Sequence, residues 1–207
     1  MDVFGVVFLV AVIVMSVVIH EVMHGVAADK LGDPTARYAG RLTLNPIPHI
    51  DLFGSIIVPF ILIYTQAAIF FAWAKPVPYN PYNLRPGRFS EAIVAGAGPL
   101  SNLAIALIAS AVVRLGLFPG VADILLMIII VNVMLFAFNL IPIPPLDGSK
   151  VIEALLPRPL AHGYDSFRRR LESNPFLGMG LVLIIIILLG NMWGSFIYSF
   201  ARLIAGV

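Results

Sequence analysis

The sequence predicts an all-α polytopic membrane protein with about four full transmembrane helices and a re-entrant or hairpin segment at 50–74. Of its 207 residues, 60% are hydrophobic and only 12% are charged, with a mean hydropathy of +0.98. Soluble domains are only roughly 45–50% apolar. Five apolar runs are long enough to cross a bilayer, which takes about 20 residues. These runs are 3–28, 50–74, 91–117, 121–141 and 176–204.

Composition also limits the chemistry that the chain can perform. It has no cysteine, which excludes disulfides, Cys-ligated zinc and thiol catalysis. Any metal must therefore be held by histidine and carboxylate side chains. A net charge of +2 gives no indication of nucleic-acid binding. No internal repeat or second soluble domain is visible, so we expect one membrane domain over residues 1–207.

The first run carries the motif His20-Glu21-x-x-His24. Positions i and i+4 share one face of a helix, so His20 and His24 can present two imidazoles to one metal, with Glu21 beside them. This arrangement is typical of zinc hydrolases, although the spacing also arises by chance in soluble helices. Residues 6–19 contain no charged side chain, and an ionisable group near the bilayer centre costs roughly 2.5–3.5 kcal/mol. Three such residues at the end of this run predict a metal site inside the membrane.

The second run differs from the others because it contains polar and helix-breaking residues between two proline-rich stretches, 46–48 and 75–78. The residues within it are Asp51, Gly54, Pro59 and Gln66. Prolines remove backbone donors and favour extended or broken structure. We expect this segment to enter the membrane without crossing it.

The third and fourth runs bring further site candidates. Small residues at 95–102 allow neighbouring helices to approach closely. The fourth run ends at 138–148, where three prolines break the helix before Asp147. A catalytic zinc site keeps three protein ligands and one open position, so the two histidines need a third partner. Asp147 has the best context for that role, His49 and Asp51 are rivals, and a simple Asp-Gly turn is the alternative.

Three motifs together resemble those of the site-2 protease family of intramembrane zinc metalloproteases. They are His20-Glu21-x-x-His24, Gly98-Pro99-x-x-Asn102, and Asn139-x-x-Pro142 followed by Leu146-Asp147-Gly148. They lie in the order expected for the family, and jointly they are far more specific than the first motif alone. The resemblance implies that His20, His24 and Asp147 bind one zinc ion and that Glu21 is the general base.

The resemblance also implies that Asn139 and Asn102 line the active site. The alternative for both is interhelical hydrogen bonding, worth about 0.6 kcal/mol on average. The implied activity is regulated intramembrane proteolysis, which hydrolyses a peptide bond within or near the membrane-spanning helix of a substrate protein. The chain is similar to a minimal form of the family, because no PDZ domain, CBS domain or span before the first motif is recognisable. The expected partners are a transmembrane substrate and membrane lipids, with no nucleic acid, and the oligomeric state is left open.

The number of membrane crossings, odd or even, and the distribution of charge predict how the chain is arranged in the membrane. If His20, His24 and Asp147 meet at one metal, the first and fourth runs end on the same side, which requires a re-entrant second run. That topology places eleven Lys and Arg residues on one side and two on the other, whereas five full crossings give eight and five. Lys and Arg concentrate in cytoplasmic loops. We therefore expect a multi-pass protein of a prokaryotic plasma membrane, with both termini outside and the metal near the cytoplasmic face.

A stretch around 73–79 has the prolines of an extended segment and offers an edge for pairing with an unwound substrate, as in strand addition. The aromatic residues Trp73, Tyr79 and Tyr82 are equally consistent with an interfacial belt. Replacing Val77 with proline should block the pairing, and unchanged cleavage would count against the edge hypothesis.

Two other classes of protein could use the same features. In a metal-ion transporter or channel, His20, His24 and Asp147 would be transit ligands. Transport usually requires several weak stations, whereas these residues are expected at one depth. A scaffold that binds membrane helices without cutting them would have no need of Glu21.

Overall fold

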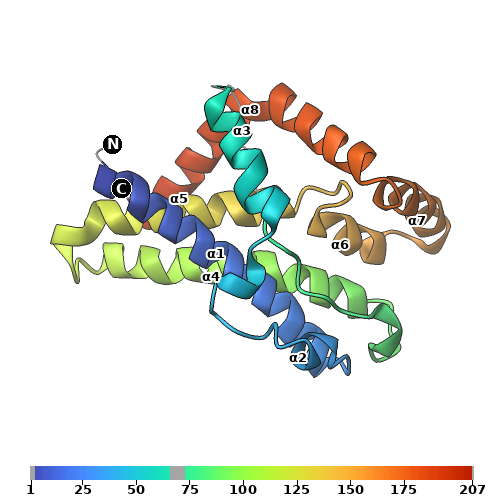
Figure 1. Cartoon of the computed structure of the whole chain (residues 1–207). Helices are drawn as coiled ribbons and strands as arrows, with labels where there is room; N and C mark the ends of the chain where they lie inside the picture. Colours follow the sequence, from blue (N-terminus) through green and yellow to red (C-terminus); the bar gives the residue numbers. More distant parts are fainter. Residues whose placement is uncertain (1–2, 66–72, 207) are drawn as a thin grey trace. The chain divides into compact units, whose positions relative to one another are not determined.

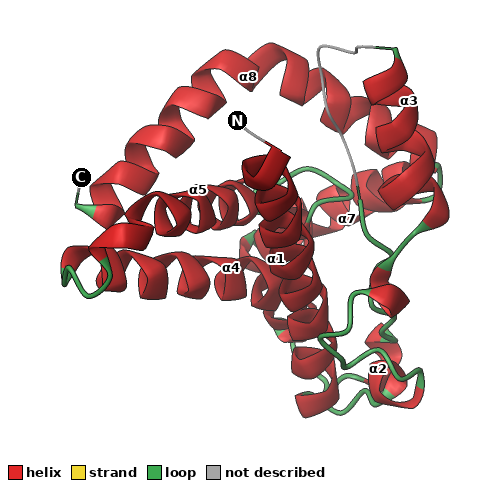
Figure 2. Cartoon of the chain, turned by 60° about the vertical axis from the view of Figure 1, so that its left-hand side comes forward, coloured by secondary structure: helices red, strands yellow, loops and turns green. Residues whose placement is uncertain are grey.

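The computed structural model describes residues 3–65 and 73–206 (Figure 1), and Figure 2 shows only helices and loops in these ranges. The all-α prediction is therefore confirmed for the described residues. The chain contains two compact units, Met1–Leu84 and Arg85–Val207. Each has its own internal packing.

The first unit is built on one long helix. Its elements are α1 (Val3–Lys30), α2 (Thr35–Tyr38), η1 (Ile47–His49), η2 (Leu52–Ile57), α3 (Val58–Tyr64) and η3 (Pro81–Asn83). The chain leaves α1 at Gly32, whose φ of 109° lies in the left-handed region that glycine adopts without steric cost. α2 then packs back against α1.

Helix α1 buries polar and ionisable side chains and exposes many of its large apolar ones. Large apolar side chains on it are exposed, among them Val7 and Val10, whereas Ser16, His20 and His24 are buried. An ionisable or polar side chain within a membrane-spanning helix faces the protein interior, and the apolar remainder faces lipid. The burial pattern of α1 is the one expected for a transmembrane helix.

The expected re-entrant segment at 50–74 forms short helices in its described part. Asp51 caps η2, because its carboxylate accepts a hydrogen bond of 2.7 Å from Gly54 N. η2 is a turn of π-helix that leads into α3. Residues 66–72, including Gln66, lie outside the described residues, so the re-entrant path remains a prediction.

The second unit contains α4 (Ser90–Arg114), η4 (Pro119–Val121), α5 (Ala122–Asn139), α6 (Asp147–Leu155), α7 (Arg158–Glu172) and α8 (Pro175–Ala205). Helices α4 and α5 lie side by side, joined by the short turn at η4, and α8 packs against both (Figure 1). Their common core consists mainly of small and β-branched residues. Its buried members are Ala106, Ala109, Ile129, Val133, Ile197, Ala201 and Ala205.

The predicted close approach at 95–102 is explained by the small residues of α4. Ala95, Gly98, Asn102 and Ala106 recur at helical spacing and are all buried. Because this stripe carries little side-chain bulk, the backbones of α4 and α5 can come near one another. Asn102 is fully buried and its Nδ2 donates to Asn132 Oδ1 at 2.9 Å, which links the two helices.

Three described helical segments are long and apolar enough to span a membrane: Val3–Lys30, Ser90–Arg114 and Pro119–Asn139. In α8, the arms Gly180–Leu188 and Trp193–Ala205 meet at 74° and pass the same test together. Counting α8 as one span gives four, as the sequence predicts. The chain is therefore an integral membrane protein.

Candidate metal centre

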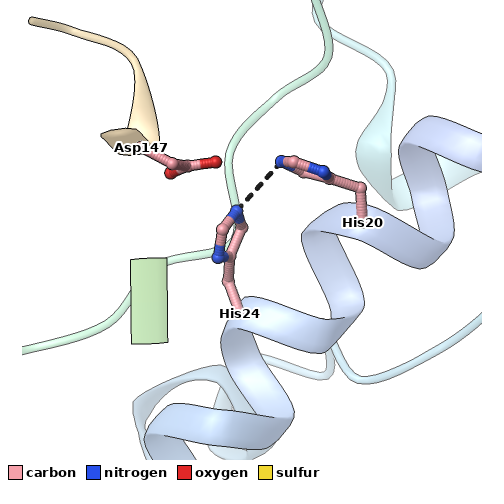
Figure 3. Close-up of side chains that lie close together, drawn as sticks. All are labelled: His20, His24 and Asp147. Atoms are coloured by element: carbon pink, nitrogen blue, oxygen red, sulfur yellow. Dashed lines mark hydrogen bonds between the residues drawn. The ribbon is translucent and has the colours of Figure 1, made fainter. Parts of the chain in front are cut away.

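Two buried imidazoles face one another near the C-terminal end of α1 (Figure 3). His20 Nε2 and His24 Nε2 are 3.1 Å apart, and the rings are nearly perpendicular, at 87°. A tetrahedral zinc ion with Zn–N bonds of about 2.0–2.1 Å would hold two nitrogens about 3.3 Å apart. The pair therefore has the separation of two ligands of one zinc ion, as predicted from the i, i+4 spacing.

Asp147 is the first residue of α6, where the chain resumes a helix after the proline-rich break. Gly148 makes this turn possible. A Cβ at that position would lie 2.3 Å from Leu140 O and 2.6 Å from Ile141 O, and both are backbone atoms. Only glycine allows the end of α5 to pack so closely on the start of α6. Within the Leu-Asp-Gly sequence, the glycine is thus required by packing, and it fixes the position at which α6 begins with Asp147.

Among the described residues, one group of three ionisable side chains could hold a metal ion: His20, His24 and Asp147. Their possible ligand atoms all lie within 4.8 Å of one another (Figure 3). Two imidazoles and one carboxylate form a donor set typical of catalytic zinc, which needs three protein ligands and an open position. The donor set therefore suits zinc.

Glu21 is held by the backbone of a distant segment of the same unit. Its Oε2 accepts a hydrogen bond of 2.9 Å from Val77 N. Gly25 permits this approach, because a Cβ there would lie 2.6 Å from Leu42 Cδ2 and 2.8 Å from Val77 Cγ1. The glycine after the second histidine thus lets residues 73–84, which we call the strap, lie against α1.

The strap is anchored through alternate residues. Trp73 N donates to Gly54 O at 3.1 Å and Lys75 N to His49 O at 2.9 Å. The next alternate N–H, from Val77, is the one bound to Glu21. This alternation fits an extended segment. The Val77→Pro substitution is therefore not a selective test of substrate pairing, since it would remove the bond to Glu21.

The far end of the strap is tied to α1 by Asp33. This fully buried carboxylate accepts hydrogen bonds from Asn80 N at 2.6 Å, Asn83 Nδ2 at 2.9 Å and Thr35 Oγ1 at 2.5 Å. Burial raises the pKa of Asp33, but the hydrogen bonds from Thr35, Asn80 and Asn83 outweigh it, and the net shift is below the ordinary value. Sequence reasoning did not identify Asp33. The available signal was the turn-forming sequence Gly32-Asp33-Pro34-Thr35.

The two rival ligands have structural roles. His49 Nε2 lies 3.0 Å from Thr43 O, and the His49 carbonyl accepts the hydrogen bond from the strap. Asp51 caps η2. Neither belongs to the group that includes Asp147.

The two asparagines predicted to line the site are engaged within the second unit. Asn102 donates to Asn132, a residue that sequence reasoning did not single out. Asn139 is half-buried, and its Nδ2 donates to Leu135 O of its own helix at 2.9 Å. The bond between Asn102 and Asn132 is an interhelical hydrogen bond, which is the alternative considered for Asn102. A role for either residue at the site remains a prediction.

Comparison with known proteins agrees with this chemistry. Residues 116–169 match the model of Peptidase family M50. The chain is 39% identical over 160 residues to YwhC of Bacillus subtilis (strain 168). The aligned residues make up 72% of this chain and 69% of that protein. No solved structure matches the chain.

Two further relatives come from distant organisms. MJ0611 of Methanocaldococcus jannaschii is 33% identical over 143 residues, or 66% of this chain and 64% of that protein. Rip2 of Mycolicibacterium smegmatis is 29% identical over 142 residues, or 67% of this chain and 53% of that protein. The names of all three relatives assign them as zinc metalloproteases. The chain therefore belongs to peptidase family M50, the site-2 protease family, and is a zinc metalloprotease.

Proposed function

We propose that this protein hydrolyses peptide bonds within or near the membrane-spanning helix of substrate proteins, in a prokaryotic plasma membrane. The observation that carries the proposal is the setting of the motif. His20 and His24 are buried on a helix whose exposed large side chains are apolar. A protease site on such a helix is reached by a substrate that is itself in the membrane.

The site lies below the membrane interface and short of the bilayer centre. From His24 to Asp29 the helix rises about 7–8 Å at 1.5 Å per residue. Irregular backbone at that depth is tolerated only where it is buried or lines a wet cavity. The proline-rich segment before Asp147 is such backbone, and we assign it to the path by which water enters from the cytoplasmic face.

The chemistry follows from the roles of four side chains. His20, His24 and Asp147 would hold one zinc ion, which when bound acidifies water towards a pKa of about 7 and polarises the scissile carbonyl. Glu21 Oε2 is occupied by the Val77 N–H, so Oε1 is the oxygen that takes the proton from water. Glu21 then gives that proton to the leaving amine. The Val77 bond keeps the carboxylate in one orientation during both transfers.

The asparagines enter the proposal as secondary groups. An amide near the scissile bond can donate to the oxygen that gains negative charge. Asn139 is at the end of α5 that leads to Asp147, which favours it for this role. Asn102 supports the same helix through Asn132.

The experiment is cleavage of a single-span substrate by the purified full chain reconstituted in liposomes. Mass spectrometry of the fragments locates the cut bond. The Glu21→Gln variant should cleave at least about 100-fold more slowly than wild type. It should still retain one zinc ion per chain. Asp123→Asn, at the opposite end of α5, is the control and should cut normally.

Two results would contradict the proposal. Normal cleavage by Glu21→Gln would remove the general base and with it the protease chemistry assigned here. Cuts confined to soluble peptides, with transmembrane helices left intact, would keep the metalloprotease but reject intramembrane cleavage. The relatives do not favour a metal-ion transporter. Transport of zinc across the membrane that is unchanged in the Glu21→Gln variant would support a transporter instead.

A further inference from the structure

A cavity lies in the Arg85–Val207 unit, and none of His20, His24 and Asp147 lines it. It has a volume of about 340 Å³ and is formed by the start of α4, by α6 and by α7. Pockets that bind small ligands usually begin at about 300 Å³. The cavity is lined by Gly87, Arg88, Glu91, Ala92, Lys150, Glu153, Ala154, Arg158, Ala161 and His162.

Among the charged side chains that line this cavity, three are cationic and two are acidic. Arg88, Lys150 and Arg158 come from three separate parts of the unit and line one space. Of the two acidic residues there, Glu153 is bound by Arg168 Nε at 2.7 Å. Arg168 lies outside the lining and offsets the charge of Glu153. Glu91 is the other lining carboxylate, and against it stand the three cations, so the net charge that a ligand meets is positive.

Two of these cations are arginines beside the starts of helices. Arg88 donates through Nη2 to Leu156 O, which fixes its guanidinium between the start of α4 and the end of α6. Arg158 is the first residue of α7. In the described part of the chain, neither arginine forms an ion pair with an acidic side chain. Both are therefore available to an anion.

The start of α4 also faces the cavity, although Glu91 in its first turn offsets part of the positive potential of this helix end. Gly87, Arg88 and Glu91 belong to the segment where this helix of 25 residues begins. Unpaired N–H groups and the helix dipole favour an anion at such an end. The planar guanidinium of arginine also matches phosphate, which it binds through two parallel hydrogen bonds.

We propose that this cavity binds a phosphate-bearing anion, either the headgroup of an anionic phospholipid or a free phosphate compound. Basic pockets beside membrane helices on the cytoplasmic side are known to receive anionic headgroups. Helix α7 fits a position at the lipid boundary, because it exposes Leu160 and Phe167 as well as basic residues.

The test uses the detergent-purified full chain and two probes. Native mass spectrometry measures binding of phosphatidylglycerol against phosphatidylcholine. Thermal unfolding in inorganic phosphate is compared with unfolding in acetate of the same ionic strength. Wild type should bind at least one phosphate probe, and the double variant Arg88→Gln/Arg158→Gln should weaken binding about tenfold or more. The control, Arg170→Gln, removes an exposed arginine of α7 outside the cavity.

The two arms identify the source of the ligand. Preference for phosphatidylglycerol without an effect of inorganic phosphate indicates a lipid headgroup, and the converse indicates a free phosphate compound. Arg88→Lys/Arg158→Lys keeps the charge and should restore part of the binding if the Gln variant is folded but empty. The proposal is overturned if neither probe binds, if acetate acts as well as phosphate, or if the Gln variant binds like wild type.

Discussion

Glu21, the proposed general base, shows how two single residues can position a third. To act as a base, Glu21 needs one free carboxylate oxygen and a fixed orientation of the carboxylate plane. The hydrogen bond of 2.9 Å from Val77 N fixes that orientation. Gly25 leaves the room that Val77 occupies. Two glycines therefore support the proposed site: Gly25 beside Glu21, the proposed general base, and Gly148 beside the carboxylate proposed as a zinc ligand.

Substituting Gly148 tests this view directly. In Gly148→Ala, the new Cβ meets backbone atoms of Leu140 and Ile141, so the start of α6 must move and Asp147 moves with it. A displacement of about 1 Å at a catalytic group can cost on the order of 100-fold in rate. We expect a fall of that size in kcat/KM, measured on the reconstituted substrate.

The matched control for this prediction is Gly163→Ala. Gly163 lies within α7, and a methyl group added there would meet no other heavy atom within 4 Å. Alanine at this position should stabilise the helix by roughly 0.5–1 kcal/mol. Equal activities for the two glycine variants would show that the tight turn does not hold the zinc ligand.

Motif spacing alone predicts a site at His20, His24 and Glu21, because the three residues lie within little more than one turn of one helix. Val77 and Asp33 could not be identified in this way. Their bonds to the rest of the site join residues 56 and 47 positions apart. No local pattern in the sequence specifies such a pair, and only the folded path of the strap brings it together.

At the scale of elements, the strap depends on Asp33. One carboxylate binds the turn after α1 through Thr35 and the strap through Asn80 and Asn83. Asp33→Asn leaves one oxygen in place of two and removes the negative charge, so it cannot satisfy all of these donors. The strap should loosen, and with it the position of Glu21.

The pKa of Asp33 gives this prediction a pH dependence. A folded-state pKa below the ordinary value means that the ionised carboxylate stabilises the protein above about pH 4. That contribution is lost as the pH falls through the lowered pKa. The Tm of Asp33→Asn should therefore be below that of wild type at pH 7, and the difference should shrink only below about pH 4.

Asp29→Asn is the control for the same turn. Asp29 pairs with Arg37; the Arg37 side chain is 64% exposed and the Asp29 side chain 13% exposed, and a pair with one solvent-exposed partner contributes roughly 0–1 kcal/mol. It should change Tm little at any pH. A difference between wild type and Asp33→Asn that stays constant from pH 7 to pH 3 would contradict the account of the strap.

The helices themselves were predictable because apolar length and small-residue spacing are local properties of the chain. The runs at 91–117 and 121–141 correspond closely to α4 and α5. The pairing of Asn102 with Asn132 was not predicted, because the register between two helices depends on how their surfaces pack. Nor was the bend in α8, since no proline lies at that point to indicate one.

At the scale of the whole molecule, topology depends on how often the chain crosses the membrane. Three described helical segments and the bent α8 account for up to four spans. The distribution of Lys and Arg predicts both termini outside and the long loops inside. The path of residues 50–74 decides between this topology and five full crossings.

The lack of cysteine allows a direct topology experiment, because each introduced cysteine is the sole thiol in the chain. We expect Ser166→Cys and Arg85→Cys to react with a membrane-impermeant reagent only after the cytoplasmic face is opened. Gly120→Cys, in the turn before α5, should react in intact cells. Opposite accessibility of Tyr38→Cys, at an exposed position of α2, and Arg85→Cys would mean that residues 50–74 cross the membrane.

The central claim is that His20, His24 and Asp147 bind one zinc ion, and the zinc content of the Asp147→Ala protein tests it most directly. The account predicts about one zinc per chain in wild type and in the control Asp123→Asn, and a loss of most of that zinc from Asp147→Ala after dialysis against a weak chelator. Asp147→Ala protein that keeps one zinc per chain with unchanged affinity would contradict it.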